Sequence, residues 1–155
     1  MNTDKFKLSD PIQFLALGFG SGLAPKAPGT FGTIAAIPLL WLCSTITIMQ
    51  YALLVCVMAF IGIYICEHAA KAAGVHDHPA IVWDEIVGLF ITMFMIPLTW
   101  QSILVGFILF RLFDIFKPWP ISWLDKHCHG GFGIMIDDIV AGFAALACMH
   151  LIYST

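Results

Sequence analysis

Charged residues are scarce in this sequence of 155 residues. Asp, Glu, Lys and Arg together make up only 11% of the chain, whereas hydrophobic residues make up 60%. A soluble domain of this length exposes much of its area to water and needs a larger share of charge to cover it. The composition therefore excludes an ordinary soluble enzyme and a disordered chain. It favours an integral membrane protein in a single domain, residues 1–155.

Several functional signatures are also missing. The chain has no run of Lys or Arg, which excludes a nucleic-acid-binding module. Its five cysteines are odd in number and form no CxxC pair, which argues against a disulfide framework and suits small hydrophobic side chains. No GxSxG elbow, no DxD pair and no Cys followed six residues later by Arg occurs. The catalytic motifs of serine hydrolases, haloacid-dehalogenase phosphatases and cysteine-nucleophile phosphatases are therefore absent.

The longest uncharged stretch comprises the 40 residues between Lys26 and Glu67. A single helix of that length would span roughly 60 Å, about twice the hydrocarbon core of a bilayer, so the chain must fold back. Polar residues at 44–50 indicate the turn. The pattern predicts helices near 31–45 and 50–70, with Gly74 ending the second.

A second uncharged stretch runs from Ile86 to Phe110, with Pro97 near its middle. The Lys and Arg residues lie before the first predicted helix, in the polar segment 67–85 and after residue 110, so the positive-inside rule places all three regions in the cytoplasm. As one helix this stretch would be long enough for a single pass, but the rule requires it to return to its starting face, so we predict a hairpin that is broken at Pro97 or re-entrant. A last apolar run, 139–153, is marginal for a full span. These segments predict an all-α integral membrane bundle with short or re-entrant helices.

Carboxylates lie at the edges of the apolar stretches, at Asp84-Glu85, Asp114 and Asp137-Asp138. Ionisable residues in such places are functional candidates, and converging oxygen donors suit a hard divalent cation such as Mg²⁺. Asp84, Glu85, Asp137 and Asp138 are the candidate metal ligands. Adjacent helical residues point about 100° apart, so one residue of each pair can face the ion; Asp84 and Asp138 are favoured, and Glu85 and Asp137 could equally take that place. The alternative is solvation at the membrane boundary, or pairing with Arg111 and Lys117.

Two groups of residues could bind an anion. Arg111, Asp114 and Lys117 follow one another at intervals of three, so a helix would place them along one face as a phosphate clamp. The alternative is a set of salt bridges to Asp114. The Gly- and Pro-rich segment 18–33 carries Lys26, Thr30 and Thr33 before the first long helix, where backbone N–H groups could cradle an anion. The alternative is a turn that only caps the helix.

Four blocks together resemble the bacterial phosphatidylglycerophosphatase A family: GFGSGLAPKAPGTFGT (18–33), HDHPAIVWDEIVG (76–88), FRLFDIFKPWPI (110–121) and HGGFGIMIDDIVAG (129–142). The resemblance implies a bundle of about six helices, so we expect five to six. It also implies Mg²⁺-dependent hydrolysis of phosphatidylglycerophosphate to phosphatidylglycerol and inorganic phosphate. The matched residues are Thr30, Thr33, Asp84, Glu85, Arg111, Asp114, Lys117, Asp137 and Asp138.

From the residues and the resemblance we expect Asp84, Asp114, Asp137 and Asp138 to be catalytic. Lys26, Thr30, Thr33, Arg111 and Lys117 are expected to bind the substrate. The attacking group could be water or an aspartate that forms an aspartyl-phosphate.

We expect a multi-pass protein of the bacterial inner membrane, with a phospholipid substrate and an active site facing the cytoplasm. The rival hypothesis is a small ion transporter that uses its carboxylates as ion sites. That hypothesis predicts acidic residues inside the apolar stretches rather than at their ends.

Overall fold

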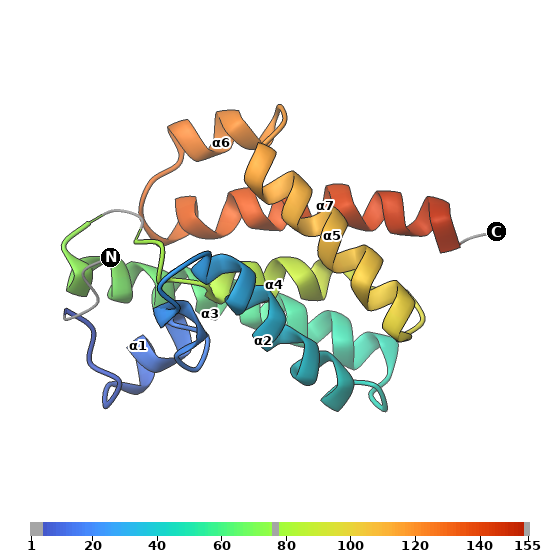
Figure 1. The fold of residues 1–155 in the computed structure, drawn as a ribbon, viewed down its shortest axis with the longest axis horizontal. Coiled ribbons are helices and arrows are strands. Elements are labelled where there is room, and N and C mark those ends of the chain that lie inside the picture. Colours follow the sequence, from blue (N-terminus) through green and yellow to red (C-terminus); the bar gives the residue numbers. More distant parts are fainter. Residues whose placement is uncertain (1–4, 76–77, 154–155) are drawn as a thin grey trace.

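The computed structural model describes residues 5–75 and 78–153, and within these ranges it contains helices and no strand. Residues 76–77, which begin one of the four sequence blocks, lie outside the described residues. Figure 1 shows the helices in chain order. They are α1 (Pro11–Ala16), the 3₁₀ turn η1 (Ser21–Leu23), α2 (Pro28–Leu42), α3 (Ile48–Ala73), α4 (Trp83–Thr92), α5 (Trp100–Phe116), α6 (Ile121–His127) and α7 (Gly130–Tyr153).

The all-α class is confirmed. The described residues form more helices than the expected five to six, because α1 and α6 arise in segments that the hydropathy pattern left as loops. Asp10 begins α1 by accepting hydrogen bonds from the backbone N–H groups of Ile12 and Gln13. Pro120 immediately precedes α6, and the N–H of Trp123 then bonds back to its carbonyl. A side-chain cap at Asp10 and a proline turn before α6 thus start short helices that hydrophobic periodicity alone did not reveal.

The predicted fold-back between α2 and α3 is confirmed. Helix α2 ends at Leu42, and Thr47 caps α3 through a reciprocal pair of hydrogen bonds with Gln50. The polar residues that indicated the turn are thus the ones that satisfy the free N–H groups of the next helix. Gly74 ends α3 in the left-handed conformation, at φ 69°, as predicted.

The predicted hairpin in 86–110 is also confirmed. Helix α4 ends at Thr92, the chain turns through Pro97, and Thr99 caps α5. The far end of α5 returns to the start of α4, where Arg111 Nη1 lies 3.7 Å from Glu85 Oε1.

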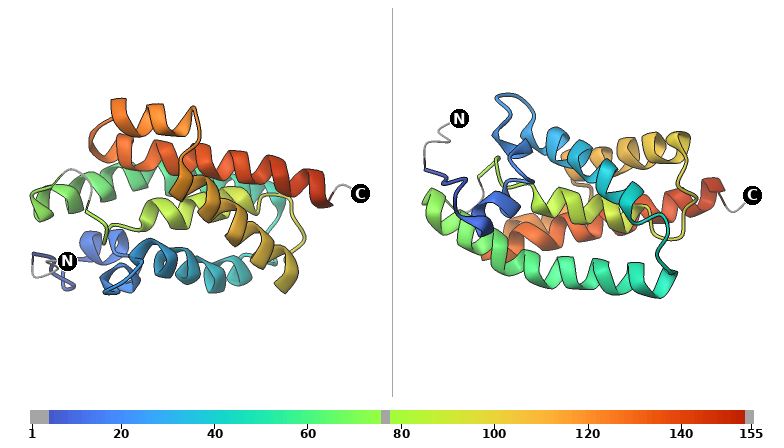
Figure 2. Two further views of the ribbon diagram at one scale, coloured as in Figure 1. Left: turned by 45° about the horizontal axis from the view of Figure 1, so that its top comes forward. Right: turned by 90° about the horizontal axis from the view of Figure 1, so that it is seen from below.

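Helix α4 is the centre of the bundle and packs against α2, α3, α5 and α7 (Figure 2). Its backbone approaches α7 closely, since a Cβ atom on Gly142 would lie only 2.7 Å from the Gly88 carbonyl oxygen. The hydroxyl of Tyr51 donates to the Phe90 carbonyl at 2.8 Å, and the indole N–H of Trp83 donates to the Met58 carbonyl at 3.1 Å. These contacts hold the acidic first turn of α4 at a defined place beside α7.

The last apolar run, 139–153, which looked marginal for a full span, is part of a longer helix. Helix α7 begins at Gly130, so Asp137 and Asp138 lie about two turns inside it instead of at its end. The cause is close packing on α3. A Cβ atom on Gly131 would lie 1.9 Å from the Ile63 carbonyl oxygen, and the Gly131 N–H donates to Glu67 Oε2 at 2.6 Å. In the sequence these glycines indicate a loop, but in the structure they form the first turn of a helix.

Two described helices, α3 and α7, are long and apolar enough to cross a membrane. The segments that carry most Lys and Arg residues gather at one end of the bundle. The α2–α3 and α4–α5 turns and the end of α7 lie at the other end (Figures 1 and 2). The basic segments therefore lie on one side of the bundle, as their positions in the sequence predicted.

Candidate active site

A polar cavity of about 290 Å³ opens where the start of α2, the start of α4, the end of α5 and the first half of α7 meet. All five predicted carboxylates line it, and so do the two predicted cations, Arg111 and Lys117. The lining residues are Ala27, Pro28, Gly29, Pro79, Ile81, Asp84, Glu85, Arg111, Asp114, Ile115, Lys117, Ile134, Asp137 and Asp138.

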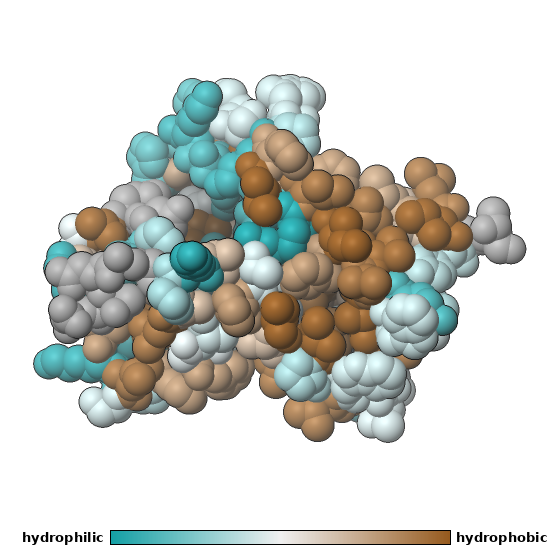
Figure 3. All heavy atoms as spheres, viewed as in Figure 1, coloured by the Kyte–Doolittle hydropathy of each residue, from teal (hydrophilic) through white to brown (hydrophobic). Residues whose placement is uncertain are grey.

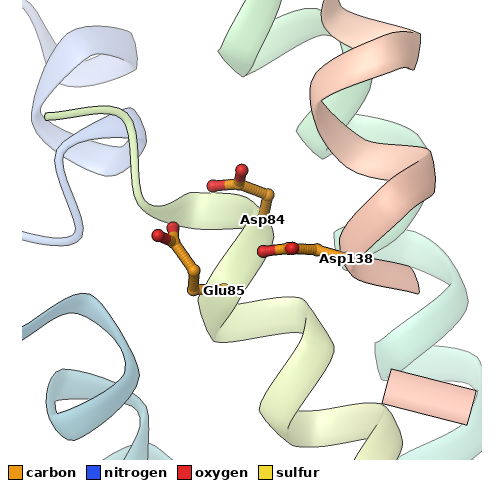
Figure 4. A group of neighbouring side chains, drawn as sticks. All are labelled: Asp84, Glu85 and Asp138. Carbon is orange, nitrogen blue, oxygen red and sulfur yellow. The ribbon is translucent and has the colours of Figure 1, made fainter. Parts of the chain in front are cut away.

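Three of the carboxylates form a compact group. Asp84 and Glu85 lie in the first turn of α4, where the helix dipole favours negative charge, and Asp138 faces them from α7 (Figure 4). Each contributes one oxygen, and these oxygens lie within 4.8 Å of one another. Asp138 is only 2% exposed. Asp84 and Asp138, the pair favoured from the sequence, both belong to the group, but Glu85 belongs to it as well, although adjacent helical residues were expected to face different directions.

This group has the properties of a cation site. Glu85 Oε2 and Asp138 Oδ2 are buried and have no hydrogen-bond partner among the described residues. Burial and the neighbouring charge of Asp138 together raise the pKa of Glu85 well above its usual value. A bound divalent cation would offset both effects, and three hard oxygen donors fit Mg²⁺.

The basic residues line the same cavity, each paired with carboxylates. Arg111 donates through Nη1 to Asp114 Oδ2 and also lies beside Glu85. Lys117 Nζ donates to Asp137 Oδ2 at 2.6 Å and to Asp125. The salt bridge between Arg111 and Asp114 that the sequence left as an alternative is therefore present. Asp137, predicted as a metal ligand, pairs with Lys117 and stands outside the group of three.

Lys117 does not continue the face of α5, contrary to the expectation from its spacing. The helix ends at Phe116, and Lys117 is its C-cap in the left-handed conformation, at φ 40°. Pro118 follows, and a residue before proline is excluded from the right-handed helical region. Burial by itself would lower the pKa of Lys117, but its hydrogen bonds to Asp125 and Asp137 raise the pKa above its usual value, so the side chain stays charged.

The predicted anion-binding side chains at the start of α2 do not line the cavity. Lys26 is exposed, Thr30 is half-buried in the first turn, and the buried Thr33 hydroxyl donates to the Gly29 carbonyl at 2.8 Å. The backbone of the segment takes their place, because Ala27, Pro28 and Gly29 border the cavity.

Gly29 is a site residue that the sequence reasoning missed. A Cβ atom at this position would lie 2.2 Å from Glu85 Oε1 and 3.0 Å from Arg111 Nη1. Only glycine therefore lets the start of α2 come this close to the ion pair. The sequence did carry a signal. Glycine follows proline at the start of a helix, where a glycine has no side chain with which to cap the free backbone N–H groups.

Comparison with known proteins identifies the family of the chain. The family model of phosphatidylglycerophosphatase A matches residues 14–153. The chain belongs to the phosphatidylglycerophosphatase A family. A phosphatidylglycerophosphatase A of Escherichia coli K12 is 48% identical over 96% of this chain and 87% of its own length. One from Haemophilus influenzae is 46% identical over 92% of this chain and 88% of its own length.

A third relative of this phosphatidylglycerophosphatase A family member comes from Bacteroides thetaiotaomicron and is provisionally named a phosphatidylinositol-3-phosphatase. It is 34% identical over 83% of this chain and 84% of its own length. No solved structure matches the chain. The family resemblance read from the four sequence blocks is confirmed, and the chain is an enzyme, a phosphatase of phospholipid metabolism.

Proposed function

We propose that this phosphatase hydrolyses phosphatidylglycerophosphate to phosphatidylglycerol and inorganic phosphate, with Mg²⁺ as its cofactor. One observation carries the proposal: the group formed by Asp84, Glu85 and Asp138 lines the same cavity as Arg111 and Lys117. A cation site beside two fixed positive charges suits a phosphomonoester, which carries up to two negative charges. The names of the relatives from E. coli and H. influenzae support the choice of substrate.

Asp84, Glu85 and Asp138 would hold the Mg²⁺ ion. When bound there, Mg²⁺ would neutralise a phosphate oxygen and the negative charge that develops during the transfer. The three carboxylates are well placed for this role, because α4 is fixed at the centre of the bundle and Asp138 lies on a neighbouring helix.

The other residues of the cavity bind and orient the phosphate. The planar guanidinium of Arg111 presents two N–H groups to two oxygens, and Asp114 holds it in place. Lys117 supplies a point charge and is oriented by Asp137. The start of α2 adds the positive end of its dipole. Asp114 and Asp137 thus hold these two cations in position.

The reaction transfers one phosphoryl group to water. The oxygen of the attacking water bonds to phosphorus while the bond from phosphorus to the glycerol oxygen breaks. One carboxylate of Asp84, Asp114, Asp137 and Asp138 accepts the proton of the water, and the departing glycerol oxygen takes up a proton. A rigid, largely buried cavity favours this step because its charges need not reorganise.

The proposed location is the bacterial inner membrane, with several crossings and the cavity at the cytoplasmic face. The Lys and Arg residues gather at the end of the bundle that holds the cavity, as the positive-inside rule requires. The phosphate would then lie at the membrane surface while the acyl chains stay in lipid.

The deciding experiment measures inorganic phosphate released from phosphatidylglycerophosphate in mixed micelles by the purified protein. We expect release with Mg²⁺ and loss of release when EDTA removes it. Phosphatidic acid, a lipid phosphomonoester with a different head group, serves as the comparison substrate. Absence of release with any divalent cation would contradict the proposal and would return the ion-transport hypothesis to consideration.

Replacing Lys117 with alanine is expected to raise KM about tenfold and to change kcat less. The reason is that a charge-assisted hydrogen bond to the ground-state phosphate is lost. Steady-state kinetics on phosphatidylglycerophosphate measures the effect. Lys126→Ala is the control, because Lys126 is exposed on α6 and does not line the cavity. An unchanged KM in Lys117→Ala would mean that Lys117 only forms salt bridges.

A further inference from the structure

A second, apolar cavity of about 440 Å³ lies between α2 and α5. Each residue that lines it is aliphatic or aromatic, and none carries a charge. They are Ile34, Ile37 and Trp41 from α2, and Trp100, Ile103, Leu104 and Phe107 from α5. Several of these side chains are open to the surroundings: Ile34 is 45% exposed, Leu104 50% and Trp100 68%. The cavity is therefore a groove on the surface of the bundle.

This α2–α5 groove lies next to the polar cavity along the same two helices. The same two helices border both, with Gly29 and Arg111 at the polar end and Ile34 and Phe107 at the apolar end. Phe107 precedes Arg111 by four residues, about 6 Å along the helix, and Ile34 follows Gly29 by five, about 7.5 Å. Figure 3 shows the hydrophilic hollow near the middle of this face, bordered by hydrophobic residues over α2 and α5.

We propose that the α2–α5 groove binds an acyl chain of the lipid substrate while the phosphate occupies the polar cavity. The inference rests on the proposed function, and it names the part of the substrate that the groove recognises. A phospholipid has a charged phosphate joined through glycerol to apolar chains, and the two cavities follow in the same order of polarity at one turn of separation. The chain would leave the cytoplasmic face and run toward the bilayer centre along both helices.

The groove acts by orienting the lipid substrate. An acyl chain in a bilayer is already in apolar surroundings, so moving it into the groove yields little hydrophobic free energy. A chain that lies along α2 and α5 instead limits the directions from which the glycerol phosphate enters the cavity. Holding the reacting groups in a productive geometry accelerates the reaction. We therefore expect the groove to set the dependence of kcat/KM on chain length.

A second protein molecule is a less suitable occupant. The groove ends about one helical turn from the polar cavity, so a partner helix seated in it would crowd the mouth through which the phosphate must enter. An acyl chain that belongs to the substrate itself arrives together with the phosphate and causes no such obstruction.

The test compares two variants in which tryptophan replaces an exposed isoleucine. Ile34→Trp obstructs the groove. Ile61→Trp is the matched control, because Ile61 is 49% exposed on α3 and lines neither cavity. Leu104→Trp repeats the obstruction from the α5 side. Each protein is assayed on phosphatidylglycerophosphate with six-carbon and eighteen-carbon chains, in mixed micelles at a constant ratio of detergent to lipid.

We expect the wild-type protein and Ile61→Trp to have a higher kcat/KM for the eighteen-carbon substrate than for the six-carbon substrate. In Ile34→Trp and Leu104→Trp the eighteen-carbon value should fall about tenfold while the six-carbon value stays within twofold. An absence of chain-length dependence in the wild type would overturn the proposal. An equal loss on both substrates, or no loss in either groove variant, would overturn it as well.

Two further outcomes can be distinguished from the results described above. Failure of the wild type to release phosphate from either substrate would contradict the proposed function itself. A change of oligomeric state in Ile34→Trp but not in Ile61→Trp, measured by light scattering of the purified protein, would identify the groove as an interface between two copies of the chain.

Discussion

Asp138→Asn is expected to reduce kcat for phosphate release by about 10²–10³-fold, and Asp84→Asn to do the same. Each change removes one negative charge from the group of three carboxylates while leaving a side chain of the same shape. Mg²⁺ should then bind more weakly, and raising its concentration should restore part of the activity. Steady-state kinetics over a range of Mg²⁺ concentrations measures both effects.

Asp10→Asn is the control for these two variants. Asp10 caps α1 away from the cavity, and asparagine is an equally good N-cap residue, so the fold loses little. Its kcat should stay within about twofold of the wild-type value. Near-normal turnover in both Asp84→Asn and Asp138→Asn would refute the assignment of the metal site.

Gly29→Ala is expected to lower kcat/KM by about 10²-fold without unfolding the protein. The added Cβ would lie 2.2 Å from Glu85 Oε1, so the buried Glu85 carboxylate has to move away from Asp84, Asp138 and Arg111. A displacement of about 1 Å in a catalytic group costs activity on this scale. The concentration of Mg²⁺ needed for half-maximal activity should also rise.

Gly106→Ala is the matched control for this change. Gly106 lies inside α5, and its added Cβ would meet the sulfur of Met93, at the flexible part of that side chain. Alanine also favours a helix by up to about 1 kcal/mol over glycine. We expect activity within twofold of wild type and full helical content by circular dichroism. Normal Mg²⁺ dependence in Gly29→Ala would show that the close approach of α2 has no role in the site.

Local signals in the sequence predicted much of the secondary structure. The polar residues around Thr47 and the proline at position 97 interrupt the two uncharged stretches, and the structure turns at both places. These predictions were right because capping and proline sterics act over a few residues. The local pattern showed only the apolar run 139–153 and not the earlier start of α7, where Gly131 packs closely against α3.

Residue types alone also indicated the candidate site. Carboxylates and basic residues in a chain so poor in charge are costly to place near lipid, and this singled out Asp84, Glu85, Asp114, Asp137, Asp138, Arg111 and Lys117. All of them line one cavity. The sequence did not show which of these residues have different neighbours in the folded protein. Asp137 and Asp138 are neighbours, yet one pairs with Lys117 and the other faces Asp84 and Glu85.

By itself, the sequence determined the helical class, the main turns, the family and the set of charged residues, because composition, capping and charge are local properties of the chain. Only the tertiary structure decided that Asp138 joins α4, that Lys117 turns toward Asp137, that Gly29 must lack a side chain, and that an apolar groove follows the polar cavity. These features depend on the distance between helices, and that distance is set by packing between residues far apart in the chain.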